Sequence, residues 1–582
     1  MANFYTDNED IQFLFHHFDM ARLAKIMEED FRFHEDYAFA PEDADDATDN
    51  YERILKMTGE LCAERIAPTA EETDRTGNVL NDDGSVTYTP GIADAIRSLG
   101  QADLMGFTLP YRFGGLNCPN LLYTMSNEIV SRADAALMNV YGLQGIAETI
   151  NAFASEEIKQ QYLPRMASGE WTGAMVLTEP DAGSDLQAVR VRAWQDDDGQ
   201  WFVRGVKRFI TNGCGDVLLV LARSEPEISD GRGLSLLVVD RGPKVKVRRL
   251  EDKLGIHGSP TCELFFDSAP AQLIGDRQRG LITYVMSLMN GARVGIAAQS
   301  LGIAEGAYRV ARDYAHSRKQ FDTPIETFPA VRELLVEMSL DIQAARALTY
   351  HGSFCVDIEV GALKKLASDR IEPDEKKTLK KLSRSYKRIN GLLTPMSKYY
   401  ASEMSMRVSN GAMAVLGGSG YMRDYPVERH LRDARITTIY EGTTQLQVIA
   451  AVRGVSAGMA KTVVETLLDA RETWPEDLAP LVEQIRAGLD DLNEAVAFVK
   501  EQGGTEYMDL VGRKLVDMAI TLVVGVLFCD QATANDAKKP VARRWLAVGM
   551  PDLRKNKELI CSGDRSAMTD FETLAGPVPV TD

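Results

Sequence analysis

The spacing of apolar residues changes along the chain, and each change predicts a different kind of secondary structure. From about 51 to 171 apolar residues recur every three to four positions, as on one face of a helix. Between about 172 and 279 they fall in short β-rich runs such as WFVRGVKRFIT and DVLLVLARS, separated by Gly, Asp and Asn turns. Helical spacing returns at about 280–458 and continues through 459–582. The pattern predicts an α+β fold in which an antiparallel β domain separates two all-α domains.

The two ends of the chain add further helical segments. Residues 1–50 carry aromatic and acidic positions in helical register and then the acidic run PEDADDATDN, which predicts an extension followed by a linker. The tail 459–582 has its densest apolar run in LVDMAITLVVGVLF. That run falls short of the ~20 residues that a membrane span needs, so we expect a buried helix and no membrane span.

Composition narrows the function classes. The chain has 582 residues, 45% apolar and 26% charged, which is typical of a multidomain globular protein. Its 65 basic and 85 acidic residues give a charge of −20, which disfavours nucleic acid as a partner. The N-terminus lacks the features of a signal peptide, so a cytoplasmic location is expected. Seven scattered cysteines without a CxxC pair predict reduced thiols and no metal site.

The segment RITTIYEGTTQLQ places one acid, Glu441, between Tyr440 and Gly442 after a Thr-rich, apolar approach. Burial raises the pKa of a carboxyl group, which suits a general base that removes a weakly acidic C–H proton beside a carbonyl. A single Glu before Gly is otherwise a helix cap or a surface acid. This segment alone leaves both interpretations open.

Three more segments carry candidate chemistry. In MVLTEPDAGSD, Pro180 and Gly183 predict a turn where main-chain amides approach a ligand, and Thr178 and Ser184 supply hydroxyls. KRFITNG ends a strand, and SRKQFDTPI holds Arg318, whose guanidinium fits a phosphate. Taken singly, these are also an ordinary β-turn, a hairpin end and a solvated helix face.

Taken together and in order, these segments resemble the signatures of the acyl-CoA dehydrogenases, with AVLGGSGYMRDYP as a fifth match. The resemblance covers about residues 51–453. It implies an N-terminal all-α domain, a middle antiparallel β-barrel domain, a C-terminal four-helix-bundle domain, and the C-terminal helical extension of larger members. It also implies FAD, an acyl-CoA substrate, a trans-2-enoyl-CoA product, an electron-transferring flavoprotein as acceptor and a homodimer.

The resemblance implies a role for each matching residue, with Glu441 as the catalytic base. The residues implied to contact the cofactor are Met175, Leu177, Thr178, Gly183, Ser184, Phe209, Thr211, Arg318, Gln320, Phe321, Ala414, Gly417, Gly418, Thr443 and Gln445. Those implied to contact the substrate are Ser184, Asn290, Arg293, Tyr440, Gly442 and Arg453. Thr211 would bond flavin N5, and Arg318 and the Gly417 loop would reach the FAD of a second subunit.

The sequence departs from the family pattern at a few positions. Phe209 replaces a Trp, and Ala414 and Pro329 stand where many members have Gln, so some polar adenosine contacts must differ. Some relatives carry the base on another helix, at the position of Ala292 here. Alanine cannot accept a proton, which leaves Glu441 as the matching base.

Two alternative functions stay open. An acyl-CoA oxidase would use the same base and flavin but admit oxygen, and a non-catalytic scaffold would keep only the fold. The intact Glu441, Thr178, Thr211 and Gln445 argue against a scaffold. The basic stretch 364–388 predicts a surface helix pair around a Glu-Pro break, either a solvated face or a docking surface for an acidic partner.

Overall fold

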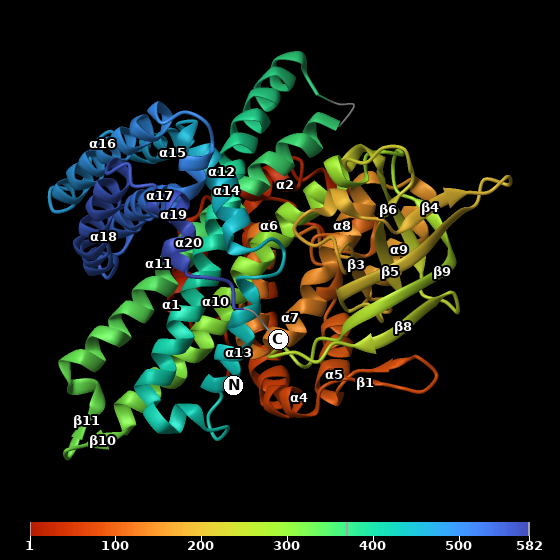
Figure 1. The fold of residues 1–582 in the computed structure, drawn as a ribbon, viewed down its shortest axis with the longest axis horizontal. Coiled ribbons are helices and arrows are strands. Elements are labelled where there is room, and N and C mark those ends of the chain that lie inside the picture. Colours follow the sequence, from red (N-terminus) through yellow and green to blue (C-terminus); the bar gives the residue numbers. More distant parts are fainter. Residues whose placement is uncertain (1, 368–370, 580–582) are drawn as a thin grey trace. The chain divides into compact units, whose positions relative to one another are not determined.

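The computed structural model describes residues 2–367 and 371–579 (Figure 1). Its contacts divide the chain into two units. Unit 1 comprises residues 1–386 and 400–443, and unit 2 comprises residues 387–399 and 444–582. Each unit is described by itself.

Unit 1 begins with α1 (Glu9–His17), α2 (Met20–Met27) and α3 (Ala44–Leu61). The acidic run expected to be a linker is instead the start of α3. Asp43 caps this helix by accepting bonds from the next amides, and acidic side chains favour a helix N-terminus. Leu14 and Leu23 are buried in the same apolar core as Leu121 and Tyr350 of the later helices. The residues before 51 are thus packed into the core of the unit.

The next segment confirms the predicted helical domain. It contains α4 (Ala70–Thr76), α5 (Pro90–Gln101), α6 (Asn120–Ala133), α7 (Ala135–Tyr141), α8 (Gly145–Phe153) and α9 (Glu156–Ala167). A small hairpin, β1 (Val79–Leu80) with β2 (Val86–Thr87), interrupts it.

The β domain consists of β3 (Gly173–Val176), β4 (Arg192–Gln195), β5 (Trp201–Thr211), β6 (Val217–Arg223), β7 (Leu234–Asp240), β8 (Val245–Leu250) and β9 (Thr261–Leu273). The strand order is β3-β6-β4-β5-β9-β7, and the β6–β7 pairing closes the path into a barrel. Most pairs are antiparallel as expected, but β3 and β4 each pair in parallel with β6. Alternate residues such as Leu218, Val220 and Phe266 fill one apolar cluster of the barrel.

Long helices complete unit 1. They are α10 (Met286–Ser317), α11 (Pro329–Ala367), α12 (Pro373–Leu416), which runs into unit 2, and α13 (Val427–Thr437). The hairpin β10 (Lys319–Gln320)/β11 (Thr323–Pro324) and the short helix η11 (Gly417–Tyr421) connect them. Helix α10 packs against α6, α11 and α13 (Figure 1).

The basic stretch at 364–388 lies at the junction of α11 and α12. Helix α12 starts at Pro373, which suits a first helical position because proline has no N–H to leave unpaired. Lys376, Lys377, Lys380 and Lys381 are exposed, which confirms a surface location. Residues 368–370 of this stretch lie outside the described residues.

Unit 2 contains α14 (Thr444–Ser456), α15 (Met459–Leu468), α16 (Ala479–Glu501), α17 (Glu506–Ala534), α18 (Lys538–Cys561), α19 (Ser566–Thr569) and α20 (Phe571–Ala575). Among the described residues, two helical stretches, Gly280–Ser317 and Glu506–Ala534, are long and apolar enough to cross a membrane. The apolar window of Glu506–Ala534 is 83% buried inside the protein, and that of Gly280–Ser317 is 44% buried. Because α17 packs against α14, α15, α16 and α18, the expected buried helix in the tail is confirmed.

Candidate active site

Two segments of the β domain are joined by main-chain and side-chain bonds. The Arg208 amide, near the end of β5, donates to the Thr178 carbonyl oxygen at 3.0 Å. The fully buried Lys207 Nζ donates to the Leu177 carbonyl oxygen at 2.7 Å and to Glu179 Oε1 at 2.9 Å. The segment after β3 is therefore fixed to the end of β5.

Lys207 and Glu179 were not expected in the site. Burial lowers the pKa of Lys207 to about 8. The Glu179 carboxylate also accepts hydrogen bonds from the amides of Arg190 at 2.8 Å and Val191 at 2.9 Å, so both of its oxygens are hydrogen-bonded. Neither residue stood out in the sequence, because Lys207 is one of three basic residues in β5 and Glu179 follows the end of β3.

Phe209 is presented outward beside Thr211. The register between β5 and β9 shifts between Lys207 and Ile210, and Phe209 has a left-handed φ of 59°. A bulky residue held there costs ~1–3 kcal/mol. Its ring is 53% exposed, with the Arg208 guanidinium 4.6 Å from the ring centroid.

The other expected contacts of the β domain differ in exposure. Met175, Thr178 and Thr211 are half-buried and Leu177 is buried. Gly183 and Ser184 are exposed.

Glu441 lies in the loop that follows α13. Both Glu441 and Gly442 have left-handed φ values, 54° and 89°, and Glu441 Oε2 is shielded from solvent. Arg293 of α10 interacts electrostatically with Glu441. Burial lowers the pKa of Arg293, and the Glu441 charge counteracts that shift.

The Arg293 guanidinium makes only part of the hydrogen bonds that it could donate. Its Nη1 donates to Asn290 Oδ1 at 3.1 Å, whereas its buried Nε has no hydrogen-bond partner among the described residues. A half-buried guanidinium with an unused donor beside a carboxylate can bind a polar ligand.

Tyr440, expected to contact substrate, has its hydroxyl in a polar network. The hydroxyl lies 3.1 Å from Asn139 Oδ1 and hydrogen-bonds Gln299 Oε1. Burial, and then the Glu441 charge, raise the pKa of Tyr440. Asn139 and Gln299 had no part in the motifs, and their signal was an amide within an otherwise apolar helix.

A path of contacts joins the end of β5 to the Glu441 loop. In order, Thr211 pairs with Thr261, the Asn212 amide donates to the Pro260 carbonyl oxygen at 2.7 Å, Asn139 Nδ2 donates to Ser259 Oγ at 3.3 Å, and Asn139 Oδ1 lies beside the Tyr440 hydroxyl. The motifs around Thr211 and Glu441, far apart in sequence, thus belong to one connected structure.

A second group of expected residues lies beyond the other end of α10. Arg318, at the end of α10, and Gln320 and Phe321, on the β10–β11 hairpin, are exposed, and Phe321 is 91% exposed. Figure 1 shows this hairpin beyond the end of α10. The 25 residues from Arg293 to Arg318 span roughly 37 Å of helix, so Arg318 is remote from the Glu441 loop.

The second group of expected residues also includes residues at the end of α12 and in η11. Gly417 and Gly418 are exposed with open space where a Cβ would be, and Ala414 is exposed as well. Tyr314, near the end of α10, donates from its hydroxyl to Ser419 Oγ at 3.4 Å.

The remaining expected residues are solvent-accessible to different degrees. In unit 1, Asn290 is exposed and Gly442 and Thr443 are half-buried. In unit 2, Gln445 and Arg453 are exposed on α14.

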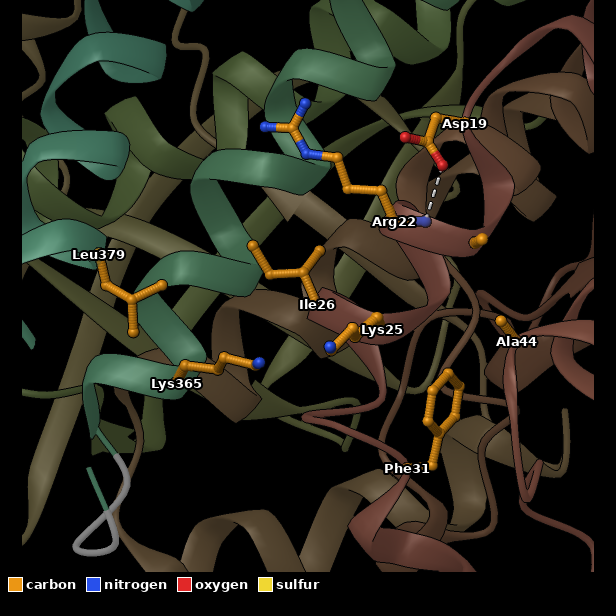
Figure 2. Close-up of a pocket in the computed structure, with 9 residues that line it drawn as sticks. Asp19, Arg22, Lys25, Ile26, Phe31, Ala44, Lys365 and Leu379 are labelled. Atoms are coloured by element: carbon orange, nitrogen blue, oxygen red, sulfur yellow. Dashed lines mark hydrogen bonds between the residues drawn. The ribbon is translucent and has the colours of Figure 1, made fainter. Parts of the chain in front are cut away.

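A pocket of about 470 Å³ lies away from these motifs (Figure 2). Figure 2 shows Arg22, Lys25 and Lys365 around the apolar side chains of Ile26 and Leu379. None of the expected site residues lines it. The pocket has a basic rim, and Asp19, which also lines it, caps α2 by accepting the Arg22 amide at 2.9 Å.

Comparison with known proteins identifies the family. Models of the acyl-CoA dehydrogenase N-terminal, middle and C-terminal domains match residues 48–170, 174–269 and 294–445. A protein of Bacillus subtilis named acyl-CoA dehydrogenase is 34% identical over 402 residues, which are 68% of this chain and 94% of that protein. The chain belongs to the acyl-CoA dehydrogenase family. It is therefore an oxidoreductase of this family.

The comparisons also cover the helical tail of the chain. A model described as acyl-CoA dehydrogenase C terminal matches residues 460–565. The 3-methylmercaptopropionyl-CoA dehydrogenase of Ruegeria pomeroyi is 30% identical over 579 residues, 90% of this chain and 92% of that protein.

Solved structures confirm the fold. Butyryl-CoA dehydrogenase from Megasphaera elsdenii, 30% identical, matches 69% of this chain and 97% of its own with a TM-score of 0.59. An acyl-CoA dehydrogenase complexed with FAD from Bacillus anthracis, 22% identical, covers 92% of both chains with a TM-score of 0.75. Because this second match covers 92% of both chains, the shared fold includes the helical tail.

Proposed function

We propose that this enzyme is an FAD-dependent dehydrogenase that converts an acyl-CoA thioester into trans-2-enoyl-CoA, with Glu441 as the base. The observation that carries this proposal is the solvent-shielded Glu441 carboxylate oxygen, with the Arg293 guanidinium as its electrostatic neighbour. The neighbouring cation favours the ionised carboxylate, which is the form that accepts a proton.

The β domain offers residues that fit a flavin. Thr178 and Thr211 supply half-buried hydroxyls on segments that are bonded together, and Phe209 offers an exposed aromatic face for a planar ring. When bound, the flavin would supply the acceptor for the β-hydrogen as hydride. We assign Thr211 to flavin N5 and Thr178 to the ring edge.

The proton step falls to residues of unit 1. Glu441 would take the α-proton while the β-hydrogen leaves, so that the two C–H bonds yield one C=C bond. Because a thioester α-proton is weakly acidic, its carbonyl oxygen needs a donor, for which we assign the Glu441 main-chain amide. Arg293, with its unused Nε donor, would bind a polar part of the substrate.

Assays with a panel of thioesters and acceptors identify the substrate and the electron acceptor. A panel of straight-chain and branched acyl-CoA thioesters should include 3-methylmercaptopropionyl-CoA, because the relative of that name matches 90% of this chain. Enoyl-CoA reduction belongs in the panel as well, since an acryloyl-CoA reductase of Anaerotignum propionicum is 32% identical over 415 residues. We propose an electron-transferring flavoprotein as acceptor. Turnover with O₂ alone that matches the dye-coupled rate would instead identify an oxidase.

We propose a homodimer because of the exposed group beyond α10. Arg318 and Gln320 lie roughly 37 Å of helix from Arg293, and Phe321 is 91% exposed. A second copy that covers this hairpin would bring Arg318 of one subunit to the cofactor phosphates of the other.

Replacement of Glu441 by glutamine tests the base. Glu441→Gln keeps the shape of the side chain but cannot take the proton, so the rate should fall by at least ~100-fold while the flavin spectrum stays unchanged. Glu337→Gln, at an exposed position on α11, is the matched control. A Glu441→Gln enzyme that retains a tenth of the wild-type rate would show that another group is the base.

A further inference from the structure

Buried polar side chains from α7 and α10 hold the residue that precedes Glu441. The Tyr440 hydroxyl contacts Gln299, which is fully buried, and Asn139, which is 6% exposed. Gln299 Nε2 donates to Asn139 Oδ1 at 2.7 Å and to the Ala135 carbonyl oxygen at 2.9 Å. A buried network of this kind fixes the geometry of its members.

The hydrogens of this network can be assigned by counting. Both hydrogens of Gln299 Nε2 are used, on Asn139 and on Ala135, which leaves Gln299 Oε1 as an acceptor for Tyr440. A flipped Gln299 amide would set its oxygen against the Ala135 carbonyl oxygen. The Tyr440 hydroxyl is therefore the donor, and its orientation is determined by Gln299.

The main chain around Glu441 makes this orientation important. The amides of Ile439 and Tyr440 both bond the Ile436 carbonyl oxygen, at 2.9 and 3.1 Å, at the end of α13. The chain then turns left-handed at Glu441 and Gly442. The side chain of Tyr440 is thus the anchor immediately before a strained turn.

Helix α10 links this anchor to the charge beside the base. Arg293 and Gln299 are six residues apart on α10, or about 9 Å along the helix. One rigid helix therefore carries both the electrostatic neighbour of Glu441 and the acceptor for Tyr440.

We propose that Gln299 and Asn139 are positioning residues that clamp the Tyr440 hydroxyl and so direct the Glu441 carboxylate toward the substrate. The proposal rests on the proposed function of Glu441 as the base. Without the clamp, the carboxylate turns toward water and loses its alignment with the α-proton. The network itself is a property of the fold and can be tested without substrate.

A double-mutant cycle tests whether Gln299 acts through Tyr440. Gln299→Leu and Tyr440→Phe should each lower kcat about tenfold or more, and the acidic limb of the kcat/KM pH profile should shift because the surroundings of the proposed base change. Because both changes break the contact between Tyr440 and Gln299, the double variant should be no slower than the slower single variant, within about twofold. Multiplying effects would overturn the proposal.

Ser131→Ala is the matched control. The buried Ser131 hydroxyl of α6 donates to the Gln299 carbonyl oxygen at 2.8 Å, so it contacts the same residue of α10 without touching Tyr440. This control should leave the pH profile in place. If the pH profile of Ser131→Ala shifted as far as that of Gln299→Leu, the effect would come from helix packing in general and the proposal would be overturned.

Hydrogen exchange separates the clamp from the chemistry. Peptides that cover residues 438–443 should exchange faster in Gln299→Leu and Tyr440→Phe than in wild type, and not in Ser131→Ala. If wild type turns over no thioester but exchange follows this order, the proposed function fails and the clamp stands. Unchanged exchange in Gln299→Leu would overturn the clamp.

Discussion

Removal of one member of the buried ion pair between Lys207 and Glu179 perturbs the β-domain part of the candidate site specifically. Lys207→Met keeps the length of the side chain but removes its bonds to the Leu177 carbonyl oxygen at 2.7 Å and to Glu179 Oε1 at 2.9 Å. The Lys207 side chain is 0% exposed and that of Glu179 is 8% exposed, so water cannot replace the lost partner. Leaving one buried charge unpaired costs about 3–5 kcal/mol.

The pair as a whole contributes much less than this loss. Burial lowers the pKa of Lys207 to about 8, because desolvation outweighs the attraction of Glu179. A double variant, Lys207→Met with Glu179→Gln, leaves no buried charge and should recover most of the stability.

Native-state hydrogen exchange of the β5 and β9 amides measures this loss within the β domain alone. A loss of about 3–5 kcal/mol corresponds to opening that is roughly a hundred- to several-thousand-fold more frequent. Lys244→Met is the matched control, because Lys244 is 56% exposed and lies 3.9 Å from Asp267, a pair worth ~0–1 kcal/mol. Lys207→Met exchange no faster than that of Lys244→Met would refute the reasoning.

Two further predictions concern the N-terminal helices and the hairpin. Burial raises the pKa of Glu28 from 4.5 to about 7, so its stabilising contribution is full below pH 4.5 and is lost as the pH rises through 7. Glu28→Gln should therefore remove about 3 kcal/mol from the pH dependence of the free energy of opening of α2. Hydrogen exchange of the α2 amides, corrected for intrinsic rates, measures this free energy, and an unchanged slope with pH contradicts the prediction. Phe321→Asp should convert the proposed dimer into monomers that lose FAD, by light scattering and flavin absorbance, whereas Phe571→Asp, at another exposed phenylalanine, should not. A flavin-loaded Phe321→Asp dimer would show that the hairpin is not the interface.

The position of the β domain could be predicted from the sequence because local signals agreed. The strands from Gly173 to Leu273 lie within the predicted β-rich stretch, since alternation and turn residues both act over a few positions. Most strand pairs are antiparallel as predicted, and the exceptions are the parallel pairings of β3 and β4 with β6. Which strand pairs with which depends on connections over dozens of residues, and the pairing of Gly173 with Val217 leaves no trace in either strand.

The linker prediction was wrong because acidic composition has two explanations. The run PEDADDATDN is rich enough in acids for a solvated linker, but the same residues cap a helix and favour its N-terminal dipole. The apolar residues that follow, Tyr51 and Leu55, are buried on one face of α3 and decide between the two. Burial of that face stabilises the helix in a way that composition alone does not reveal.

The motifs pointed to the proposed base but not to the residues that hold its neighbour. Glu441 was recognisable from its neighbours in sequence, whereas Asn139 and Gln299 are 160 residues apart and meet only in the folded chain. A single sequence gives the type of each buried polar residue but not its partner. The amide in the apolar segment GIAAQSLG indicated that a partner exists, because buried polar groups are almost always hydrogen-bonded.

The close approach of α10 to α6 explains how such partners can meet. A Cβ at Gly302 would lie 2.4 Å from the Glu128 carbonyl oxygen and 2.6 Å from the Arg132 amide nitrogen, so only glycine allows this spacing. Gln299 is three residues before Gly302 and shares its face of the helix. The spacing that Gly302 permits brings Gln299 within reach of the Ala135 carbonyl oxygen, at the start of the next helix. Backbone contact between two helices thus sets the reach of the amide that orients Tyr440, one residue before the proposed base.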